Sequence, residues 1–349
     1  MKVAVGLSGG VDSSVAALLL KEAGHEVVGV TMKLWRGTFR GGARDACFGP
    51  GEEGDIERAR ALAESIGIGY RVLDCSEAYE RGIVGVFRET SLRGETPNPC
   101  VLCNAAMKFG LLPRLARESG LDFERFATGH YARIVETGGR FALRRAVDEG
   151  KDQSYFLYRL SQEQLALAMF PLGEMTKAEV RRIAAERSLA AADQADSQDF
   201  YSGDKEELIG AEPRVGEIVD LSGRVLGRHR GFWNYTVGQR KGLGVSAHLP
   251  LYVIRLDACR NRVVLGTREE AFTKEFRVGD VHWLAQAPTD GCISAYVKVR
   301  STGAPKGPVE FEGGRCRAPG EGLFGVAPGQ SAVFYDASGV MLCGGVIQK

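Results

Sequence analysis

The stretch VAVGLSGGVDSSVAALLL, residues 3–20, decides the fold of the first half of this chain. The apolar run Val3–Leu7 predicts a buried strand, and the apolar spacing after Ser13 predicts a helix. A tight glycine turn joins the two. Such a turn gathers free backbone N–H groups and the positive end of the helix dipole, so it suits an anion.

Two familiar anion-binding loops do not match this turn. No Lys-Ser/Thr pair follows the glycines, which excludes the GxxxxGK[ST] phosphate loop, and the GxGxxG spacing of dinucleotide folds is missing. A turn made for packing alone stays open as the simpler alternative. Adjacent glycines flanked by hydroxyls and a carboxylate, SGGVDSS, favour a functional loop and resemble the pyrophosphate loop of the ATP pyrophosphatases.

Strand-like and helix-like runs alternate up to about residue 200. The predicted strands after the first are 27–32, 69–73 and 126–128, and the predicted helices are 14–23, 56–66, 105–119 and 177–187. This alternation predicts an α/β domain with a doubly wound parallel sheet. Ligands of such sheets bind beyond the carboxyl ends of the strands, where SGGVDSS, TMKLW (31–35) and ATGHYA (127–132) all fall.

After about residue 205 the pattern changes to short β-rich runs separated by Gly and Pro. This predicts a small β-rich linking domain followed by a C-terminal β-barrel. We expect the two to divide near 273–279, where FTKEFRVGD interrupts the β pattern. The expected domains are therefore an ATP pyrophosphatase-type catalytic domain (1–205), a central β-rich domain (206–275) and a barrel (276–349).

Composition describes a globular protein of 349 residues with 44% hydrophobic residues, 26% charged residues and a net charge of +1. No apolar run approaches the roughly 18 residues of a membrane span, and no basic stretch precedes a short apolar one at the N-terminus. We therefore expect no membrane association and no secretion. The eight cysteines then indicate reduced thiols and a cytoplasmic location.

The second informative stretch is TPNPCVLCN, residues 96–104. Its CxxC pair suits a redox pair, half of a zinc site, a cluster ligand or a nucleophile with a neighbour. A zinc site needs a second pair of ligands at ordinary spacing, which the sequence lacks. A thioredoxin-like function leaves the glycine loop unexplained. ATP activation beside a cysteine favours sulfur chemistry, in which an oxygen is adenylated and then displaced by sulfur.

Taken together, the motifs indicate a resemblance to one particular group of ATP pyrophosphatases. SGGVDSS, TPNPCVLCN, ATGHYAR, KDQSYFLY, YTVGQRKGLG and PGQSAVFYD occur in the order that is typical of tRNA-specific 2-thiouridylases, over nearly the whole chain. The resemblance implies ATP- and Mg²⁺-dependent replacement of O2 by sulfur at the wobble uridine of the tRNAs for Glu, Gln and Lys. It implies the tRNA anticodon loop and a sulfur donor, either a persulfide carrier protein or free sulfide, as partners.

Site residues follow from the same resemblance, position by position. The ATP site is implied to comprise Gly6, Leu7, Ser8, Gly9, Gly10, Val11, Asp12, Ser13, Met32 and Gly129. Contacts with tRNA are implied at Asn98, Pro99, Cys100, His130, Lys151, Asp152, Gln153, Arg300, Ser301 and Gln330. Catalytic roles fall on Asp12, close to the magnesium-bound pyrophosphate, on Cys103, which attacks or pairs with the sulfur donor, and on Cys100.

The sequence departs from this family at a second catalytic cysteine. The run DSQDFYS, 196–202, places Tyr201 where that cysteine is expected, and a phenol cannot carry a persulfide. We therefore expect Cys47, Cys100 and Cys103 to hold a [4Fe–4S] cluster with one open iron, since thiolates are the usual cluster ligands. In the alternative, Cys103 takes sulfur directly from a persulfide donor and Cys100 acts as the resolving thiol.

Two other functions stay open from the sequence. One is a different ATP pyrophosphatase-type synthetase that forms an amide or a guanidine, although such an enzyme does not need TPNPCVLCN or the β-rich tail. The other is a non-catalytic RNA-binding paralogue, which the missing cysteine suggests and the intact SGGVDS and KDQ oppose.

Overall fold

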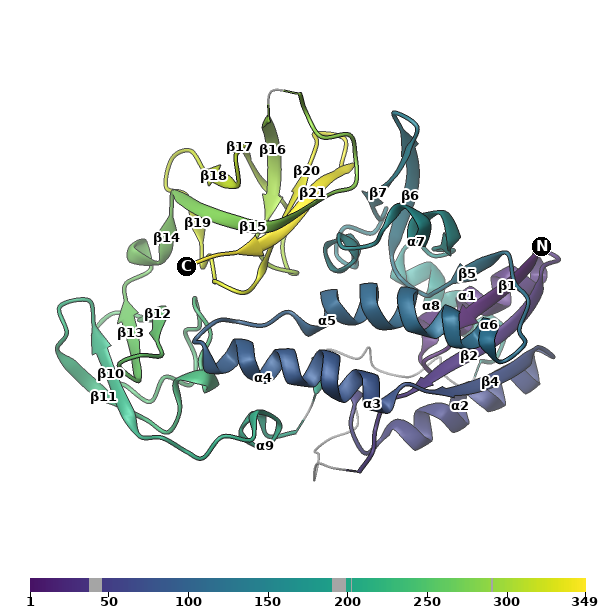
Figure 1. Ribbon diagram of the computed structural model, residues 1–349, viewed down its shortest axis with the longest axis horizontal. Helices are drawn as coiled ribbons and strands as arrows, with labels where there is room; N and C mark the ends of the chain where they lie inside the picture. Colours follow the sequence, from purple (N-terminus) through teal and green to yellow (C-terminus); the bar gives the residue numbers. More distant parts are fainter. Residues whose placement is uncertain (38–45, 190–198, 202, 290) are drawn as a thin grey trace.

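The computed structural model describes residues 1–37, 46–189, 199–201, 203–289 and 291–349 (Figure 1). A parallel sheet lies at its N-terminal end, with strand order β4-β2-β1-β5-β8. Its strands are β1 (Lys2–Gly6), β2 (Glu26–Lys33), β4 (Gly69–Asp74), β5 (Arg125–Ala127) and β8 (Ala168–Met169). The predicted doubly wound sheet is confirmed, and because β1, β2 and β5 are parallel neighbours, the segments that follow them share one edge.

Helices cover both faces of this sheet. One face packs against α1 (Val11–Glu22), α2 (Glu52–Ser65) and α8 (Lys177–Glu186) in a single apolar core. The helix α1 begins before the predicted Ser14, because Gly10 already has the extended backbone of an N-cap residue. The helix α8 begins with a capping box, in which Thr176 and Glu179 each bond the other's backbone N–H.

The opposite face packs against a long helical segment that carries the CxxC pair. The segment consists of α5 (Pro99–Leu102), the π-helical stretch η2 (Cys103–Leu111) and α6 (Leu112–Glu118). It starts earlier than the predicted 105–119, because proline is well suited to the first position of a helix. Wide π-helical turns occur often at functional sites, and this one begins at Cys103.

The other elements of the N-terminal half surround these layers. They are β3 (Ala46–Phe48), α3 (Ser76–Tyr79), η1 (Glu80–Val84), α4 (Gly85–Leu92), β6 (Ala132–Thr137), β7 (Arg140–Arg145), η3 (Ser154–Leu157), α7 (Gln162–Leu167), β9 (Asp199–Tyr201) and α9 (Lys205–Ile209). The strands β3 and β9 pair in parallel, and β6 and β7 form a hairpin.

The C-terminal half contains a small mixed sheet and a closed barrel, as predicted. The sheet has the order β11-β10-β13-β12 and the barrel β15-β18-β17-β16-β20-β21. Their elements are β10 (Gly216–Asp220), β11 (Val225–His229), η4 (Phe232–Asn234), β12 (Tyr252–Asp257), β13 (Arg262–Gly266), η5 (Glu269–Ala271), β14 (Phe272–Thr273), β15 (Glu275–Trp283), β16 (Cys292–Lys298), β17 (Lys306–Glu312), β18 (Arg315–Arg317), β19 (Leu323–Phe324), β20 (Ser331–Tyr335) and β21 (Met341–Ile347).

The expectation that FTKEFRVGD interrupts the β pattern is wrong, because these residues form β14 and most of β15; the division of the two domains near 273–279 stays a prediction. Phe276 and Val278 point into the barrel, whereas the charged Glu275 and Arg277 between them are exposed. The charges that suggested an interruption are therefore the outward half of an alternating strand.

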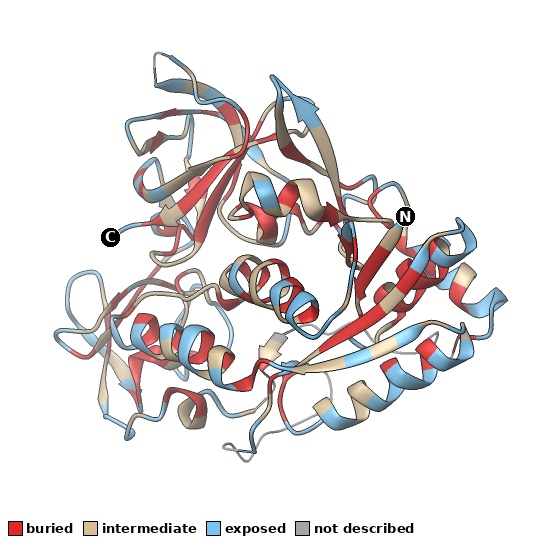
Figure 2. Cartoon of the chain, turned by 45° about the vertical axis from the view of Figure 1, so that its right-hand side comes forward, coloured by how far each residue is buried: buried red, intermediate tan, exposed pale blue. Residues whose placement is uncertain are grey.

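The barrel shares a core with the N-terminal half. Val333, Tyr335 and Met341 of the barrel pack in one cluster with Leu143 and Tyr158, so buried residues run continuously across the junction (Figure 2). A β-bridge between Arg144 and Val340 reinforces the contact. The barrel is consequently fixed against the face of the sheet on which the CxxC segment lies. No helix in the described ranges has the length and apolarity that crossing a membrane requires.

Candidate active site

The turn between β1 and α1 is held by its own hydroxyl groups. The Ser13 hydroxyl accepts the Ser8 N–H (3.2 Å) and donates to the Gly10 carbonyl (3.1 Å). The Ser14 hydroxyl donates to the same carbonyl (2.8 Å). The local sequence thus fixes the curl of the loop around the N-terminus of α1, where an anion is favoured.

Two glycines let other segments approach this loop closely. Gly9 has φ +76°, and a Cβ atom there would lie 2.6 Å from the carbonyl oxygen of Asp55 in α2. A Cβ atom on Gly129, which follows β5, would lie 2.7 Å from the backbone of Asp12 and Ser13. Neither position tolerates a larger side chain. The segment ATGHYA therefore lies directly against the first turn of α1, as its place on the shared edge of the sheet predicts.

The Asp12 carboxylate is bound by two side chains that sequence reasoning missed. Lys177 Nζ lies 2.7 and 2.8 Å from its two oxygens, and the Tyr131 hydroxyl donates to Oδ1 (2.8 Å). Tyr131 lies within ATGHYA, so its motif was a usable signal. Lys177 stands 165 residues from Asp12, and its only signal was its place just after a helix-capping threonine.

The three cysteines predicted as cluster ligands all lie near enough to Tyr79 to affect the pKa of its hydroxyl. Burial raises the pKa of the Tyr79 hydroxyl well above its usual value, and the neighbouring Cys103, Cys47 and Cys100 raise it further. Cys100 and Cys103 are half-buried, whereas Cys47 on β3 is exposed. Within the described ranges, no three His, Cys, Asp or Glu side chains converge to hold a metal ion. The fold brings the cysteines into one neighbourhood without forming a metal site there.

Tyr201 fills the position of the expected second cysteine as a packing residue. It pairs with Phe48 across β9 and β3, its ring packs 6.1 Å from the Phe48 ring, and its hydroxyl contacts Glu207 (3.3 Å). Burial, and then Glu207, raise the pKa of Tyr201 to about 12, so its phenol stays protonated. Residues 196–198 and 202 of this motif lie outside the described residues.

A short chain of neighbours connects Cys103 to the glycine loop. Burial raises the pKa of the Cys103 thiol to about 11, and the ammonium of Lys108 in the same π-helix opposes that rise. Burial lowers the pKa of His130 well below its usual value, and the charge of Lys108 lowers it further. His130 is thus neutral, bonds Thr128 (2.7 Å) and adjoins Gly129, which lies against the loop. Phe109, next to Lys108 in the π-helix that begins at Cys103, packs its ring 6.1 Å from the His130 ring and so joins the cysteine segment to this histidine.

The barrel holds the segment that precedes the CxxC pair. The Gln330 side-chain amide donates to the carbonyls of Pro97 (2.9 Å) and Thr96 (3.3 Å), and the Thr96 N–H donates to the Pro328 carbonyl (2.7 Å). The Asn98 side chain donates to the hydroxyl of Ser331 (3.3 Å). Gln330, expected to contact tRNA, thus holds the two residues that directly precede those implied to meet the target base.

The other residues predicted to contact tRNA differ in how far they are exposed. Lys151 is exposed and Ser301 half-buried. The Asp152 carboxylate is fully buried and does not reach the surface. It lies 3.5 Å from Lys298 Nζ, and this ion pair joins the N-terminal half to the barrel. Arg300 donates to the carbonyls of Val237 and Gly325. The side chain of Gln153 accepts the backbone N–H of Tyr131 (3.0 Å).

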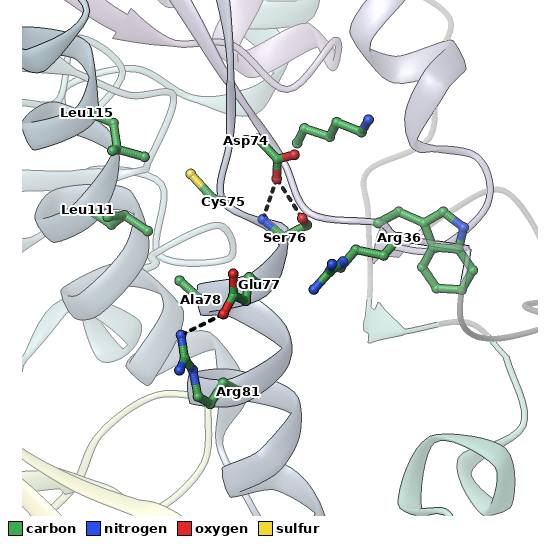
Figure 3. Close-up of a pocket in the computed structure, with 11 residues that line it drawn as sticks. Arg36, Asp74, Cys75, Ser76, Glu77, Ala78, Arg81, Leu111 and Leu115 are labelled. Atoms are coloured by element: carbon green, nitrogen blue, oxygen red, sulfur yellow. Dashed lines mark hydrogen bonds and ion pairs between the residues drawn. The ribbon is translucent and has the colours of Figure 1, made fainter.

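A cavity of about 510 Å³ opens beside the ends of β2 and β4 (Figure 3). In its wall, Asp74 accepts two hydrogen bonds from Ser76, and Glu77 pairs with Arg81. Neither the glycine loop nor the CxxC pair lines it. Cys75 does, and burial raises the pKa of its thiol to about 11. The cavity therefore adjoins the site without being part of it.

Comparisons with known proteins cover the whole chain. Residues 1–201 match the family model described as tRNA methyl transferase HUP domain, residues 207–267 match tRNA methyl transferase PRC-barrel domain, and residues 273–347 match aminomethyltransferase beta-barrel domain. A protein of Endomicrobium trichonymphae named tRNA-specific 2-thiouridylase MnmA is 43% identical over an alignment of 358 residues that covers 99% of each chain. Proteins with the same name from Trichormus variabilis and Nostoc sp. are 44% and 45% identical over 360 residues, covering 100% of this chain and 99% of theirs.

Proposed function

Because this chain belongs to the family of tRNA-specific 2-thiouridylases, we propose that it replaces O2 of the wobble uridine in tRNA with sulfur at the expense of ATP. The observation that carries the proposal is that the helical segment of Cys103 packs beside the anion-binding loop. Gly129 lies against that loop, and the ring of the adjacent His130 packs 6.1 Å from the ring of Phe109 in the π-helix that begins at Cys103. The three-domain division at 205 and 275, the tRNAs for Glu, Gln and Lys as substrates, and a cytoplasmic location are parts of the same proposal.

The first half-reaction needs the loop. Uridine O2 is a poor leaving group, and transfer of AMP onto it makes it a good one. Backbone N–H groups at the start of α1 and Ser8 would hold the pyrophosphate, and Asp12 would face the Mg²⁺ that neutralises it. Met32 and Gly129 would line the adenosine. The uridine base has to leave its stack to reach the carboxyl edge of the sheet, where the loop lies. This favours the anticodon loop over duplex RNA as the substrate.

The second half-reaction needs Cys103. Its thiolate takes the outer sulfur from a donor persulfide and releases the donor as a thiolate. The terminal sulfur of the Cys103 persulfide then attacks C2, and AMP departs with O2. Finally the Cys100 thiolate attacks Cys103 Sγ, which leaves 2-thiouridine and a Cys100–Cys103 disulfide that an external dithiol reduces. The ammonium of Lys108 supports this chemistry by favouring the thiolate of Cys103.

The predicted [4Fe–4S] cluster does not fit the arrangement in the described residues, so we derive no step through it. Anaerobic purification followed by iron and acid-labile sulfide assays tests the alternative directly. Protein without iron that still thiolates tRNA supports the persulfide route. Stoichiometric iron that is lost in Cys47→Ala would instead establish the cluster and overturn that route.

The functional test uses purified protein, unmodified tRNA, MgATP and a persulfide donor, with mass spectrometry of the digested nucleosides. We expect 2-thiouridine together with AMP and pyrophosphate. The first family description names methyl transfer, so S-adenosylmethionine without ATP is the matched control. AMP formation without a change in the uridine would favour another synthetase, and tRNA binding without either product would favour a non-catalytic paralogue.

A further inference from the structure

Lys177 occupies an unfavourable place unless it has a partner. It is the first residue of α8, where the positive end of the helix dipole opposes a cation, and it is 7% exposed. Its backbone N–H donates to Asp148 (2.9 Å), which fixes the start of the helix. Its ammonium reaches both oxygens of Asp12. The side chain is therefore built into the interior and directed at the loop.

The Asp12 carboxylate adds a negative charge at the place where the pyrophosphate is expected to bind. It lies in the first turn of α1, where the loop gathers donors for an anion. A bound pyrophosphate would bring further negative charge to the same helix end, and like charges at short range repel. Binding therefore needs a cation that can serve the phosphate as well as the carboxylate, and Lys177 is positioned to do so.

We propose that Lys177 is a pyrophosphate-binding residue that exchanges partners: Asp12 holds its ammonium in the nucleotide-free protein, and a β- or γ-phosphate oxygen holds it when ATP is bound. The inference rests on the proposed function. The flexible stem of lysine permits the exchange. The Tyr131 hydroxyl keeps its bond to Asp12 Oδ1 meanwhile, so the carboxylate remains at the loop, free for the magnesium ion that accompanies ATP.

The experiment measures ATP binding by calorimetry in EDTA, without magnesium, for four proteins: wild type, Asp12→Asn, Lys177→Met and the double variant. We expect Asp12→Asn to bind ATP about tenfold more tightly than wild type, because a charge-assisted bond to phosphate becomes available to Lys177. Lys177→Met should bind ATP about tenfold more weakly than wild type. The double variant should not show the increased ATP affinity of Asp12→Asn.

The double variant decides between two functions of the lysine. If it binds ATP as tightly as Asp12→Asn, Lys177 only neutralises Asp12 and the proposal is wrong. This comparison also holds if Lys177→Met alone fails to fold, because the double variant removes both charges of the Asp12–Lys177 pair together.

AMP and a control variant complete the design. AMP lacks the β- and γ-phosphates, so Asp12→Asn and the double variant should bind it with the same affinity. If the double variant binds AMP and ATP more weakly than Asp12→Asn by the same factor, the proposal is wrong. Arg182→Gln, on the exposed face of the same helix where Arg182 pairs with Glu186, should leave ATP binding unchanged. Wild-type protein that does not bind MgATP would contradict the proposed function instead.

Discussion

The glycine loop and the cysteine segment are the two halves of the site, and they are held in different ways. The hydroxyl bonds of the loop join residues at most five positions apart. The bonds that hold residues 96–98 reach the barrel, 232 to 234 positions away. The loop is shaped by its own sequence, whereas the cysteine segment is shaped by another part of the fold. Damage to the barrel should therefore affect sulfur transfer and leave nucleotide binding intact.

The largest expected difference between sulfur transfer and nucleotide binding is in Cys103→Ser. A hydroxyl cannot carry a persulfide, so the rate of 2-thiouridine formation should fall by about a thousandfold or more. Binding of MgATP, measured by calorimetry, should change little. Cys259→Ser, at an exposed cysteine in the turn between β12 and β13, is the control that should retain activity. An active Cys103→Ser protein would remove the cysteine segment from the chemistry.

The pH dependence of Cys103 alkylation should also be steep. Its pKa is raised to about 11, so the thiol is protonated at neutral pH, and the reactive thiolate should increase roughly tenfold per pH unit below that value. The folded state holds this proton more tightly than the unfolded chain. The resulting stabilisation is present below pH 9 and is lost as the pH rises towards 11. Iodoacetamide labelling with peptide mass spectrometry measures the rate, and a plateau near pH 8 would contradict the burial argument.

A substitution in the loop should affect both halves. Gly9→Val places a side chain at φ +76° and against the Asp55 carbonyl. We expect ATP affinity to fall by roughly a hundredfold, since strain and displaced N–H donors act together. Thiolation falls with it because no adenylate forms. Gly24→Val also has positive φ but has open space around it, and this matched control should leave ATP affinity unchanged.

The smallest effect tests the barrel contact itself. Gln330→Ala removes two hydrogen bonds to residues 96–97, and we expect kcat for thiolation to fall about tenfold. The affinities for ATP and tRNA should stay within about twofold, because on this view Gln330 acts through the segment. A weaker tRNA affinity with unchanged kcat would favour the tRNA contact that the resemblance implies. Lys349→Ala, at the exposed edge of the same junction, is the control.

Local patterns in the sequence determined a large share of this protein. The apolar strand, the glycines and the helix spacing of residues 3–20 specify a β-turn-α unit, and the CxxC pair specifies thiol chemistry, because each depends on neighbours within a few residues. Only the tertiary structure decided that Lys177 would neutralise Asp12, that Gln330 would hold Pro97 and that Asp152 would be buried beside Lys298. These pairings join distant positions of the chain. Their strength comes from burial and charge that exist only once the sheet and the barrel have packed together.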